Sequence, residues 1–412
     1  MRLRPLSVNH PSVVAILTIL GIVALGLSAH PAAAADKVVV TLEVAVKADT
    51  VAAVIAAATS EEAEFLGELP PGRDIYLVGK TIEIELKDIA KKTDELADDL
   101  EKEDGVLWAV PYDENVGGTR FYAWSEDERL NGAQGIDLRD RLDVSEAHVH
   151  ATGAGVTVAL IDTGFDLDHP LLESRLLPGI DLVDGHARAS DWKNGLDEDG
   201  DGVADESHGH GTFVAGIVAQ IAPDARILPI RAMEADGVGD MHVIIDAIDE
   251  AVARGADIIN ISFGTITESR GLEDAIERAQ DSGVVVVAAA GNHGADEERY
   301  PAALSGVISV GAFDSTADGI ATWGGYGDWV DVSAPGLEVV SAKPGGTMAT
   351  WSGSSISAPI VAAQVALMMQ IDPDKGAKDA EKIIRDTARK VTGDKQSKEG
   401  LIQLEQALQK LF

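Results

Sequence analysis

The chain contains no cysteine and few basic residues, and both shortages exclude whole classes of function. Without cysteine there is no disulfide bond, no thiolate nucleophile and no cysteine-ligated zinc. The 33 lysines and arginines stand against 69 aspartates and glutamates, a formal net charge of −36 over 412 residues. Such a charge repels nucleic acid and anionic membranes, so we expect neither as a partner. We interpret it as a solvated acidic surface that keeps the protein soluble.

Long apolar runs are scarce as well, and the exception lies at the N-terminus. Arg2 and Arg4 precede an apolar stretch at residues 13–27, about 15 residues and thus short for a membrane span. Three alanines, Ala33 to Ala35, then offer a small-residue cleavage site. The pattern predicts a secretory signal peptide over residues 1–35, a secreted protein and no membrane span in its mature form. An uncleaved N-terminal anchor is the alternative.

Residues 36–116 are expected to form a small α+β domain. Strands are predicted at residues 38–46 and 106–110, and helices at residues 49–59 and 88–100. Residues 75–86 are expected to supply two further strands, with a break near Gly79 and Lys80. The order βαββαβ suits a small sheet with helices on one face. Residues 117–144 are polar and charged, and are interpreted as a junction.

From residue 145 to 412 the pattern changes to strands alternating with helices. Strands are predicted at residues 156–161, 257–262, 284–290, 307–312 and 330–334, and helices at residues 242–254 and 272–282. Valine and isoleucine runs joined by helices indicate a doubly wound, mostly parallel α/β sheet, because strands of this kind are buried on both faces. In such sheets the functional site lies at the carboxyl ends of the strands.

Three short motifs supply an aspartate, a histidine and a serine in that order. They are IDTG at residues 161–164, HGHGTFVAG at residues 208–216 and SGSSISAP at residues 352–359. An imidazole can take the serine proton, and a carboxylate can fix the imidazole tautomer. Asp162 ends a strand predicted to be buried, where a carboxylate is unfavourable unless it has a partner. The three motifs therefore predict acyl-transfer chemistry.

These motifs resemble those of the subtilisin-like serine peptidases, or subtilases, whose triad also runs Asp, His, Ser. The resemblance implies Asp162, His210 and Ser355 as the triad. His210 is preferred to His208 because it directly precedes Gly-Thr, and Ser355 to Ser352 and Ser354 because it lies at the family position at the start of a helix. Departures from the family pattern are Phe213, where many relatives have histidine, and Ser354, Ile356 and Ser357. Phe213 is expected to alter packing, and the base itself is expected to be unaffected.

The same resemblance implies an oxyanion donor and a substrate-binding segment. Asn292, in AAAGNHG, matches the asparagine whose side-chain amide stabilises the oxyanion. Ser262, Phe263 and Gly264 match the segment that pairs with an extended peptide and walls the first specificity pocket. Arg299, before Tyr300-Pro301, is expected at the base of that pocket. An inward-pointing guanidinium would favour an acidic or polar residue before the cut bond, although charged loop residues usually face water.

An acidic loop between the Asp and His motifs resembles a calcium loop. Its expected ligands alternate, with glycine at the sixth position, and are Asp197, Asp199, Asp201, Val203 and Asp205. His208 stands where a bidentate glutamate would complete an EF-hand loop, so a grafted calcium loop is favoured over a true EF-hand. A merely solvated acidic loop remains the alternative.

The sequence as a whole predicts a secreted serine endopeptidase made as a zymogen. By the resemblance, residues 36–116 act as a pro-domain that assists folding and inhibits the enzyme, and self-cleavage near residues 117–122 releases a peptidase domain, residues 145–412. Substrates are proteins or peptides, catalysis needs no cofactor, calcium is structural, and a monomer is the default. The open alternatives are a catalytically silent pseudo-protease that acts as a binding or inhibitory module, an independent binding domain at residues 36–116, and a narrow processing enzyme in place of a broad peptidase.

Overall fold

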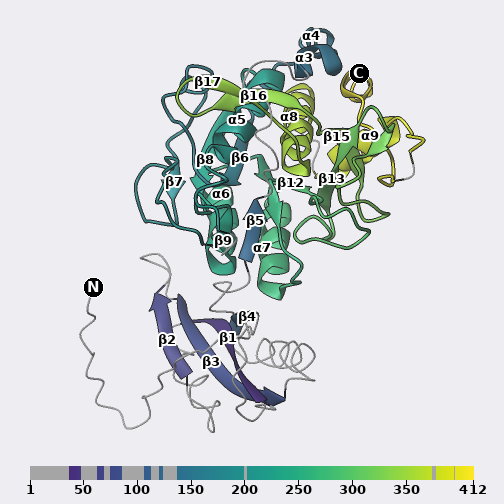
Figure 1. Cartoon of the computed structure of the whole chain (residues 1–412). Coiled ribbons are helices and arrows are strands. Elements are labelled where there is room, and N and C mark those ends of the chain that lie inside the picture. Colours follow the sequence, from purple (N-terminus) through teal and green to yellow (C-terminus); the bar gives the residue numbers. More distant parts are fainter. Residues whose placement is uncertain are drawn as a thin grey trace. The chain divides into compact units, whose positions relative to one another are not determined.

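The computed structural model describes five strands before residue 124, and then residues 137–198, 202–373, 377–393 and 395–412. The chain divides into two compact units, Met1–Thr119 with Ser269–Gly271, and Arg120–Glu268 with Leu272–Phe412 (Figure 1). The signal peptide predicted over residues 1–35 and the helices predicted at residues 49–59 and 88–100 lie outside the described residues.

The first unit contains a four-stranded antiparallel sheet with the order β2-β3-β1-β4. Its strands are β1 (Lys37–Lys47), β2 (Ala63–Glu68), β3 (Ile75–Glu85) and β4 (Val106–Tyr112). The strands predicted at residues 38–46 and 106–110 are confirmed as β1 and β4.

The prediction of two strands within residues 75–86 is wrong. Residues 75–85 form one continuous strand, β3, and the additional strand is β2, which the sequence analysis did not identify. Gly79, the expected break, pairs with Glu43 of β1 on one side and with Glu64 of β2 on the other. Ladder hydrogen bonds from both neighbours therefore hold the glycine in extended conformation, although glycine in isolation weakens a strand.

The second unit is built on an eight-stranded sheet with the order β14-β13-β12-β10-β6-β8-β7, in which β15 also pairs with β13. All its pairings are parallel except that of β13 with β14. The strands are β6 (Thr157–Asp162), β7 (Ile180–Asp181), β8 (Arg226–Arg231), β10 (Ile258–Ile261), β12 (Val285–Ala289), β13 (Val307–Asp314), β14 (Gly319–Ile320) and β15 (Val332–Pro335). The five predicted strands are confirmed within a few residues.

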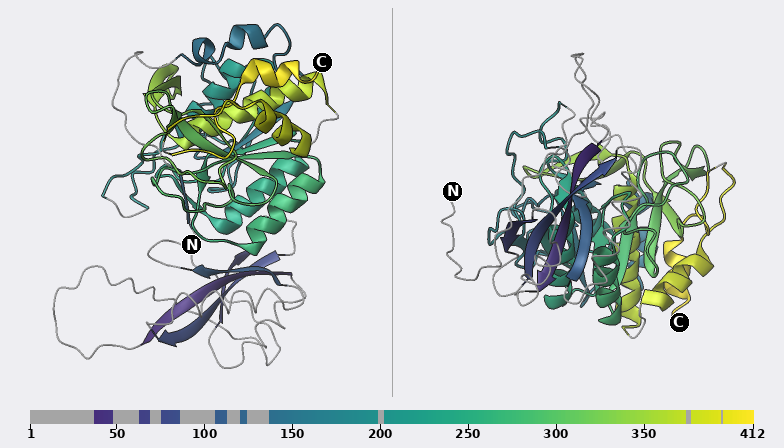
Figure 2. Two further views of the ribbon diagram at one scale, coloured as in Figure 1. Left: turned by 90° about the vertical axis from the view of Figure 1, so that its right-hand side faces the viewer. Right: turned by 90° about the horizontal axis from the view of Figure 1, so that it is seen from below.

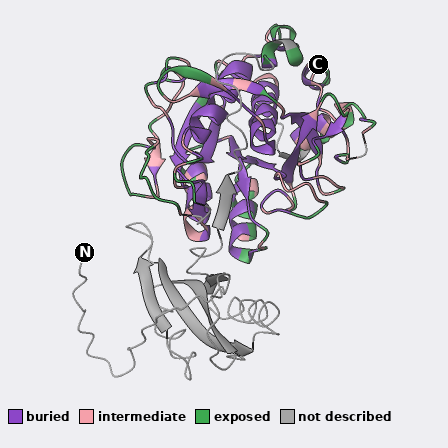
Figure 3. Cartoon of the chain, in the orientation of Figure 1, coloured by how far each residue is buried: buried purple, intermediate pink, exposed green. Residues whose placement is uncertain are grey.

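Helices cover both faces of this sheet (Figures 1 and 2). On one face α5 (His210–Ile221) packs against α8 (Ser354–Ile371), and both share a core with Val158 and Leu160 of β6. Ala159 and Ile161 are buried outside that core, on the face where α6 (Met241–Ala253) contacts β6 and β8. Burial on both faces explains why these strands are continuous apolar runs (Figure 3).

Smaller elements complete the second unit. The helices are α3 (Leu138–Arg141), α4 (Val144–Ala147), α7 (Arg270–Asp281), α9 (Ala377–Thr387) and α10 (Leu404–Gln409). A hairpin of β16 (Val339–Lys343) and β17 (Thr347–Trp351) lies beside α5. A three-stranded sheet consists of β5 (Arg120–Ala123), β9 (Val238–Asp240) and β11 (Phe263–Gly264).

Helix α8 is long and apolar enough by composition to cross a membrane, a property that the sequence analysis did not assign to it. In the structure 89% of its 18 residues are buried inside the protein. It is the central helix of the core, and its first turn carries the serine motif.

Candidate active site

The aspartate and histidine of the first two motifs meet at the carboxyl end of the sheet. Asp162 is the last residue of β6, and His210 is the first residue of α5. His210 Nδ1 lies 2.7 Å from Asp162 Oδ1, and both side chains are fully buried. Because a carboxylate only accepts, the ring donates from Nδ1. His210 Nε2 is then the acceptor, and this buried atom has no hydrogen-bond partner among the described residues.

Glycine in both motifs permits this approach. A Cβ on Gly211 would lie 2.3 Å from the Gly164 carbonyl oxygen and 3.2 Å from Asp162 Oδ1. A Cβ on Gly164, whose φ is +124°, would lie 2.7 Å from Asp191 Cα. Neither position has room for a side chain. The glycines therefore let the start of α5 come within hydrogen-bond distance of the end of β6.

Ser355 is buried in the first turn of α8, where backbone N–H groups without helical partners favour negative charge. The fourth residue after it is Pro359, which has no N–H to donate to the Ser355 carbonyl. That carbonyl instead accepts a 2.8 Å hydrogen bond from Ser262 Oγ. The proline of the motif thus ties the backbone of Ser355 to the segment that precedes β11.

Asn292 lies beside the serine motif. Its Oδ1 accepts a hydrogen bond of 2.9 Å from the Ser354 N–H, which fixes the orientation of the amide. Ser354 Oγ accepts a hydrogen bond from the Gly291 N–H, also 2.9 Å. Asn292 Nδ2 is buried and has no hydrogen-bond partner among the residues that the structure describes. Asn292 is thus a fixed donor with free capacity, bound to the residue before Ser355, and such a donor suits an oxyanion. Ser354 is itself held by these bonds.

An aromatic stack joins the histidine and serine motifs. Trp351, four residues before Ser355, stacks on Phe213 with a centroid distance of 4.7 Å and on His210 at 6.1 Å. The Phe213 ring thus packs against the tryptophan that covers the imidazole. The Asp162–His210 contact is retained. Two regions that are 145 residues apart in sequence, at His210 and Ser355, are thereby kept adjacent.

Residues 262–264 border a three-stranded antiparallel sheet with the order β11-β5-β9. Phe263 pairs with Ala123 and Gly264 with Tyr122, while Phe121 pairs with Gly239 of β9. An extended segment of the protein's own chain, β5, thus lies between two strands. A peptide that adds to such edges is bound through main-chain hydrogen bonds. The predicted peptide-binding segment therefore has an extended chain paired with it.

Arg299 is placed next to this sheet by its neighbour, since Tyr300 forms an antiparallel bridge with Thr265 directly after β11. The Arg299 side chain is 10% exposed, and Nη2 lies 2.9 Å from Glu297 Oε2. Nη1 is buried without a hydrogen-bond partner among the described residues. Arg299 is thus buried, in contrast to the usual solvent-facing charged loop residue.

The predicted calcium loop is described only in part, because Asp199 and Asp201 lie outside the described residues. Asp197 Oδ2 accepts a hydrogen bond of 2.9 Å from the Gly202 N–H, and Asp205 Oδ1 accepts one of 2.9 Å from the Asn194 N–H. Val203 is 53% exposed. These carboxylates bind the backbone of their own loop, and calcium there stays a prediction.

A different acidic group surrounds Arg231, the last residue of β8. Ligand atoms of Asp181, Asp184 and His186 lie within 4.8 Å of one another. Arg231 Nη1 binds Asp181 Oδ2 at 2.9 Å and Asp184 at 2.5 Å, and Nη2 binds Glu234 at 3.0 Å. A guanidinium therefore already binds both carboxylates of this group. Arg231 Nε also donates to the Thr163 carbonyl at 3.2 Å, next to Asp162.

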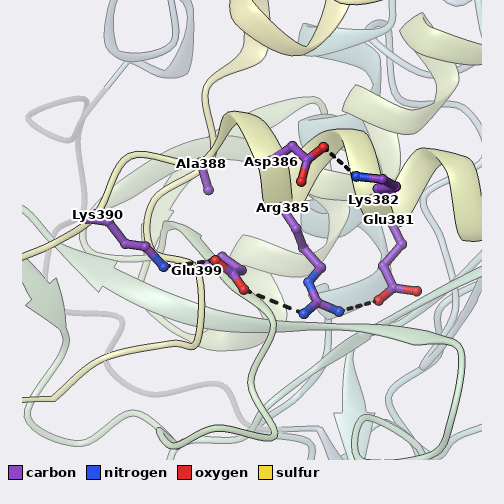
Figure 4. Close-up of a pocket in the computed structure, with 7 residues that line it drawn as sticks. All are labelled: Glu381, Lys382, Arg385, Asp386, Ala388, Lys390 and Glu399. Carbon is purple, nitrogen blue, oxygen red and sulfur yellow. Dashed lines mark hydrogen bonds and ion pairs between the residues drawn. The ribbon is translucent and has the colours of Figure 1, made fainter.

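A cavity of about 490 Å³ lies at α9 and contains no residue of the three motifs (Figure 4). Its charged side chains pair with one another: Lys382 with Asp386 at 2.6 Å, Arg385 with Glu381 at 2.7 Å, and Lys390 with Glu399 at 2.8 Å. Paired charges leave little capacity for a ligand, so we do not interpret it as the site.

Two residues next to the site escaped the sequence analysis. Arg231 carries no motif, and only its place at the end of a buried strand, in register with Asp162, could have indicated it. Asp191 follows a loop of unremarkable sequence, yet its carboxylate contacts the residue before His210. Both act through tertiary contacts that no short-range pattern encodes.

Comparisons with known proteins agree with this geometry. Residues 153–401 match the profile of the Subtilase family. The chain is 38% identical to a thermophilic serine proteinase of Bacillus sp. (strain AK1) over 252 residues, and this alignment covers 58% of each protein. It is 33% identical to thermitase of Thermoactinomyces vulgaris over 275 residues, and this alignment covers 64% of this chain and 90% of thermitase. The chain thus spans just over half of the first relative and most of the second.

Solved structures give the same result. A protease from Pseudoalteromonas arctica PAMC 21717 superposes with a TM-score of 0.58 at 28% identity, over 66% of this chain and 94% of that one. Fervidolysin from Fervidobacterium pennivorans, a keratinolytic enzyme related to subtilisin, superposes with a TM-score of 0.68 over 90% of this chain and 61% of its own. At 22% identity that second match bears on the fold alone. The chain belongs to the subtilase family and is a serine endopeptidase.

Proposed function

We propose that the enzyme hydrolyses peptide bonds through an acyl-enzyme on Ser355, with His210 as base, Asp162 as the orienting carboxylate and Asn292 as an oxyanion donor. The observation that carries this proposal is a pair of buried atoms without hydrogen-bond partners among the described residues, His210 Nε2 and Asn292 Nδ2. Unsatisfied buried polar atoms are unfavourable. The mechanism needs a proton acceptor and an oxyanion donor, and these two atoms have the capacity for those roles.

The chemistry follows from these positions. Ser355 Oγ attacks the peptide carbonyl while His210 Nε2 accepts its proton. Asp162, bound to Nδ1 at 2.7 Å, stabilises the imidazolium that results. The carbonyl oxygen gains negative charge, which Asn292 Nδ2 and the N–H groups at the start of α8 stabilise. His210 returns the proton to the leaving amine, and water then releases the acyl group by the same steps in reverse. No cofactor enters this cycle.

The enzyme is proposed to be a secreted zymogen that cleaves itself. The antiparallel register supports this: Ala123 pairs with Phe263, so the carboxyl end of β5 points toward Ser262, whose Oγ binds the Ser355 carbonyl. Residues 120–123 would therefore be on the acyl side of the bond presented to Ser355. This favours a cut beyond Ala123, later than the expected residues 117–122. The preceding domain, residues 36–116, would then act as the inhibitor through the paired strand.

Intact mass of the purified secreted protein tests this proposal. Wild type should lose residues 1–35 and at least about 80 further N-terminal residues, whereas Ser355→Ala should lose only the signal peptide. Ser352→Ala is the matched control: it removes a rival hydroxyl three residues away and should process as wild type does. Equal masses for wild type and Ser355→Ala would contradict self-processing through Ser355. A catalytically silent protein would also give equal masses.

Arg299 is proposed to favour an acidic residue before the cut bond. Its buried Nη1 has capacity for a carboxylate, and the bridge between Tyr300 and Thr265 keeps it next to the peptide-binding strand β11. Cleavage of a peptide library should show enrichment of glutamate or aspartate at that position, lost in Arg299→Met. Enrichment that is identical in both enzymes would contradict the assignment. The same profile distinguishes a narrow processing enzyme from a broad peptidase.

Calcium is proposed to bind the loop of residues 197–205 as a structural ion. Alternating carboxylates in the sequence support it, as does the exposure of Asp197 and Val203. In the Ser355→Ala protein, a chelator should lower the melting temperature, and Asp205→Asn should remove that response. A melting temperature that ignores both calcium and chelator would favour the solvated acidic loop.

A further inference from the structure

A second buried carboxylate, Asp191, lies beside the Asp162–His210 pair. Its side chain is 2% exposed. Oδ2 accepts a hydrogen bond of 2.6 Å from the backbone N–H of Gly209, the residue before His210. Oδ1 is buried without a hydrogen-bond partner among the described residues. A buried carboxylate with one oxygen that lacks a hydrogen bond is unfavourable for folding, so we expect it to have a functional role.

The backbone of Asp191 is itself fixed against the Asp162 motif. Its N–H donates to the Phe165 carbonyl at 3.2 Å, and Phe165 bridges to Ser190. Gly164, two residues after Asp162, packs so closely on Asp191 that a Cβ there would lie 2.7 Å from its Cα. Asp191 therefore links the segment after Asp162 to the first residues of α5.

Asp191 acts on the start of α5 through the backbone of Gly209. Its φ of +97° is a conformation that favours glycine, and a Cβ there would lie 2.9 Å from Pro344. As the residue that precedes α5, Gly209 sets the direction from which His210 leaves the backbone. Gly209 has no side chain to hold this turn, and the hydrogen bond from its N–H to Asp191 fixes the turn instead.

Charged and titratable groups from several neighbouring elements face Asp191. Asp162 of β6 repels it, while His210 of α5 and Arg231 of β8 attract it. His208 Nε2 lies 4.0 Å from its Oδ2. Burial raises the pKa of the Asp191 carboxyl to about 7. Its charge therefore changes near neutrality, next to the imidazole that must become positive in catalysis.

We propose that Asp191 is a positioning residue for His210: it holds the Gly209 N–H and places a negative charge beside the developing imidazolium. This rests on the proposed function, in which His210 is the base. The carboxylate form performs both tasks, and the protonated form only weakly holds the N–H. Activity should therefore depend on deprotonation of two groups, His210 and Asp191.

The decisive variants are Asp191→Asn and Asp191→Ala in the mature enzyme. Asparagine keeps the shape and an acceptor oxygen for Gly209 but has no charge, and should lower kcat/KM about 10-fold. Alanine also leaves the N–H unpaired and should lower it further. Asp224→Asn, an exposed aspartate beyond the other end of α5, removes the same charge and should leave kcat/KM unchanged. Melting temperatures identify any variant that fails to fold.

The pH profile gives the readout that a merely structural role would not move. The acid limb of log kcat/KM should be steeper than about 1 near pH 7 in wild type and have a slope of about 1 in Asp191→Asn. His208→Gln removes the neighbouring imidazole and should keep the steeper slope. A slope of 1 in wild type, or a steep slope lost only in His208→Gln, would overturn the proposal.

A readout independent of turnover separates this inference from the proposed function. In the Ser355→Ala protein, the Nδ1 proton resonance of His210 should shift near pH 7 as the neighbouring Asp191 carboxyl ionises, and Asp191→Asn should remove that component of the shift. If that resonance does not change while Ser355 is required for self-processing, the role of Asp191 alone is wrong. If Ser355→Ala still processes itself, the proposed function is wrong whatever the resonance does.

Discussion

Two buried polar clusters lie side by side at the carboxyl end of the sheet and are satisfied to very different degrees. Around Arg231, the guanidinium binds three carboxylates and the Thr163 carbonyl. Around His210, the atoms Nε2 of His210, Nδ2 of Asn292 and Oδ1 of Asp191 are buried without hydrogen-bond partners in the described part of the chain. The difference indicates two roles. The cluster whose polar atoms are hydrogen-bonded stabilises the ends of the strands, and the cluster with unpaired polar atoms is available for chemistry.

The sharpest contrast is expected from the triad. Ser355→Ala or His210→Ala should lower kcat by about 10⁴–10⁶-fold, because the residues act as a unit. Ser355→Ala should keep the melting temperature within a few degrees of wild type, since the change removes a hydroxyl and leaves no buried charge unpaired. Kinetics with a peptide substrate and calorimetry on the same samples give both numbers. A large loss of stability with retained activity would reverse the roles of the two clusters.

Arg231→Met should show the opposite pattern. The change leaves Asp181 fully buried and without its counter-ion, which typically costs about 3–5 kcal/mol. Denaturant unfolding in a Ser355→Ala background, where self-digestion cannot interfere, measures this loss. Arg254→Met, which breaks the partly exposed pair with Glu250, is the control and should cost under about 1 kcal/mol. Similar losses at the two arginines would show that burial of the Arg231 cluster does not matter.

Asn292→Ala should affect catalysis without a comparable effect on binding. Removal of one oxyanion donor typically lowers kcat by about 10²–10³-fold, and KM should change little because the donor acts in the transition state. A rise in KM at constant kcat would instead make Asn292 a substrate-binding residue. Asn292→Ala also loses the Oδ1 contact with the Ser354 N–H. Asn292→Asp keeps an acceptor there, so its melting temperature compared with that of Asn292→Ala shows how much this contact contributes to folding.

The smallest effect on activity, and the one that separates function from stability at a single residue, is expected at Asp191. Because its pKa is raised to about 7, the native state binds a proton that the unfolded state releases near pH 4. This contribution is present below pH 4 and is lost as the pH rises to 7, by at most about 1.4 kcal/mol per pH unit. Asp191→Asn lacks this loss, so its stability relative to wild type should rise between pH 5 and pH 8.

Calorimetry at both pH values, again in a Ser355→Ala background, measures that difference. A variant that is more stable at pH 8 but less active would mean that the charge is kept for catalysis. A variant less stable at pH 8 than wild type would mean that Asp191 belongs with the Arg231 cluster.

The sequence predicted those parts of the molecule that local patterns encode. Alternating apolar strands and helices indicated the parallel sheet, and the glycines at 164 and 211 accompany Asp162 and His210 because the two motifs pack against each other. The strand β2 and the continuity of β3 were not predicted, since pairing on both sides overrides the local tendency of Gly79. Arg231 and Asp191 were missed because each acts on a distant part of the chain: Arg231 binds a carbonyl 68 residues away, and Asp191 binds an N–H group 18 residues away.

The central claim is that Ser355 is the nucleophile of a site in which His210 Nε2 is its proton acceptor. The most direct measurement is labelling of the purified protein, wild type and variants, with a serine-reactive fluorophosphonate, followed by peptide mass spectrometry. The account predicts a single adduct, on Ser355, that is absent in His210→Ala and retained in Ser352→Ala. An adduct on Ser352 or Ser354, or labelling of Ser355 that persists in His210→Ala, would contradict it.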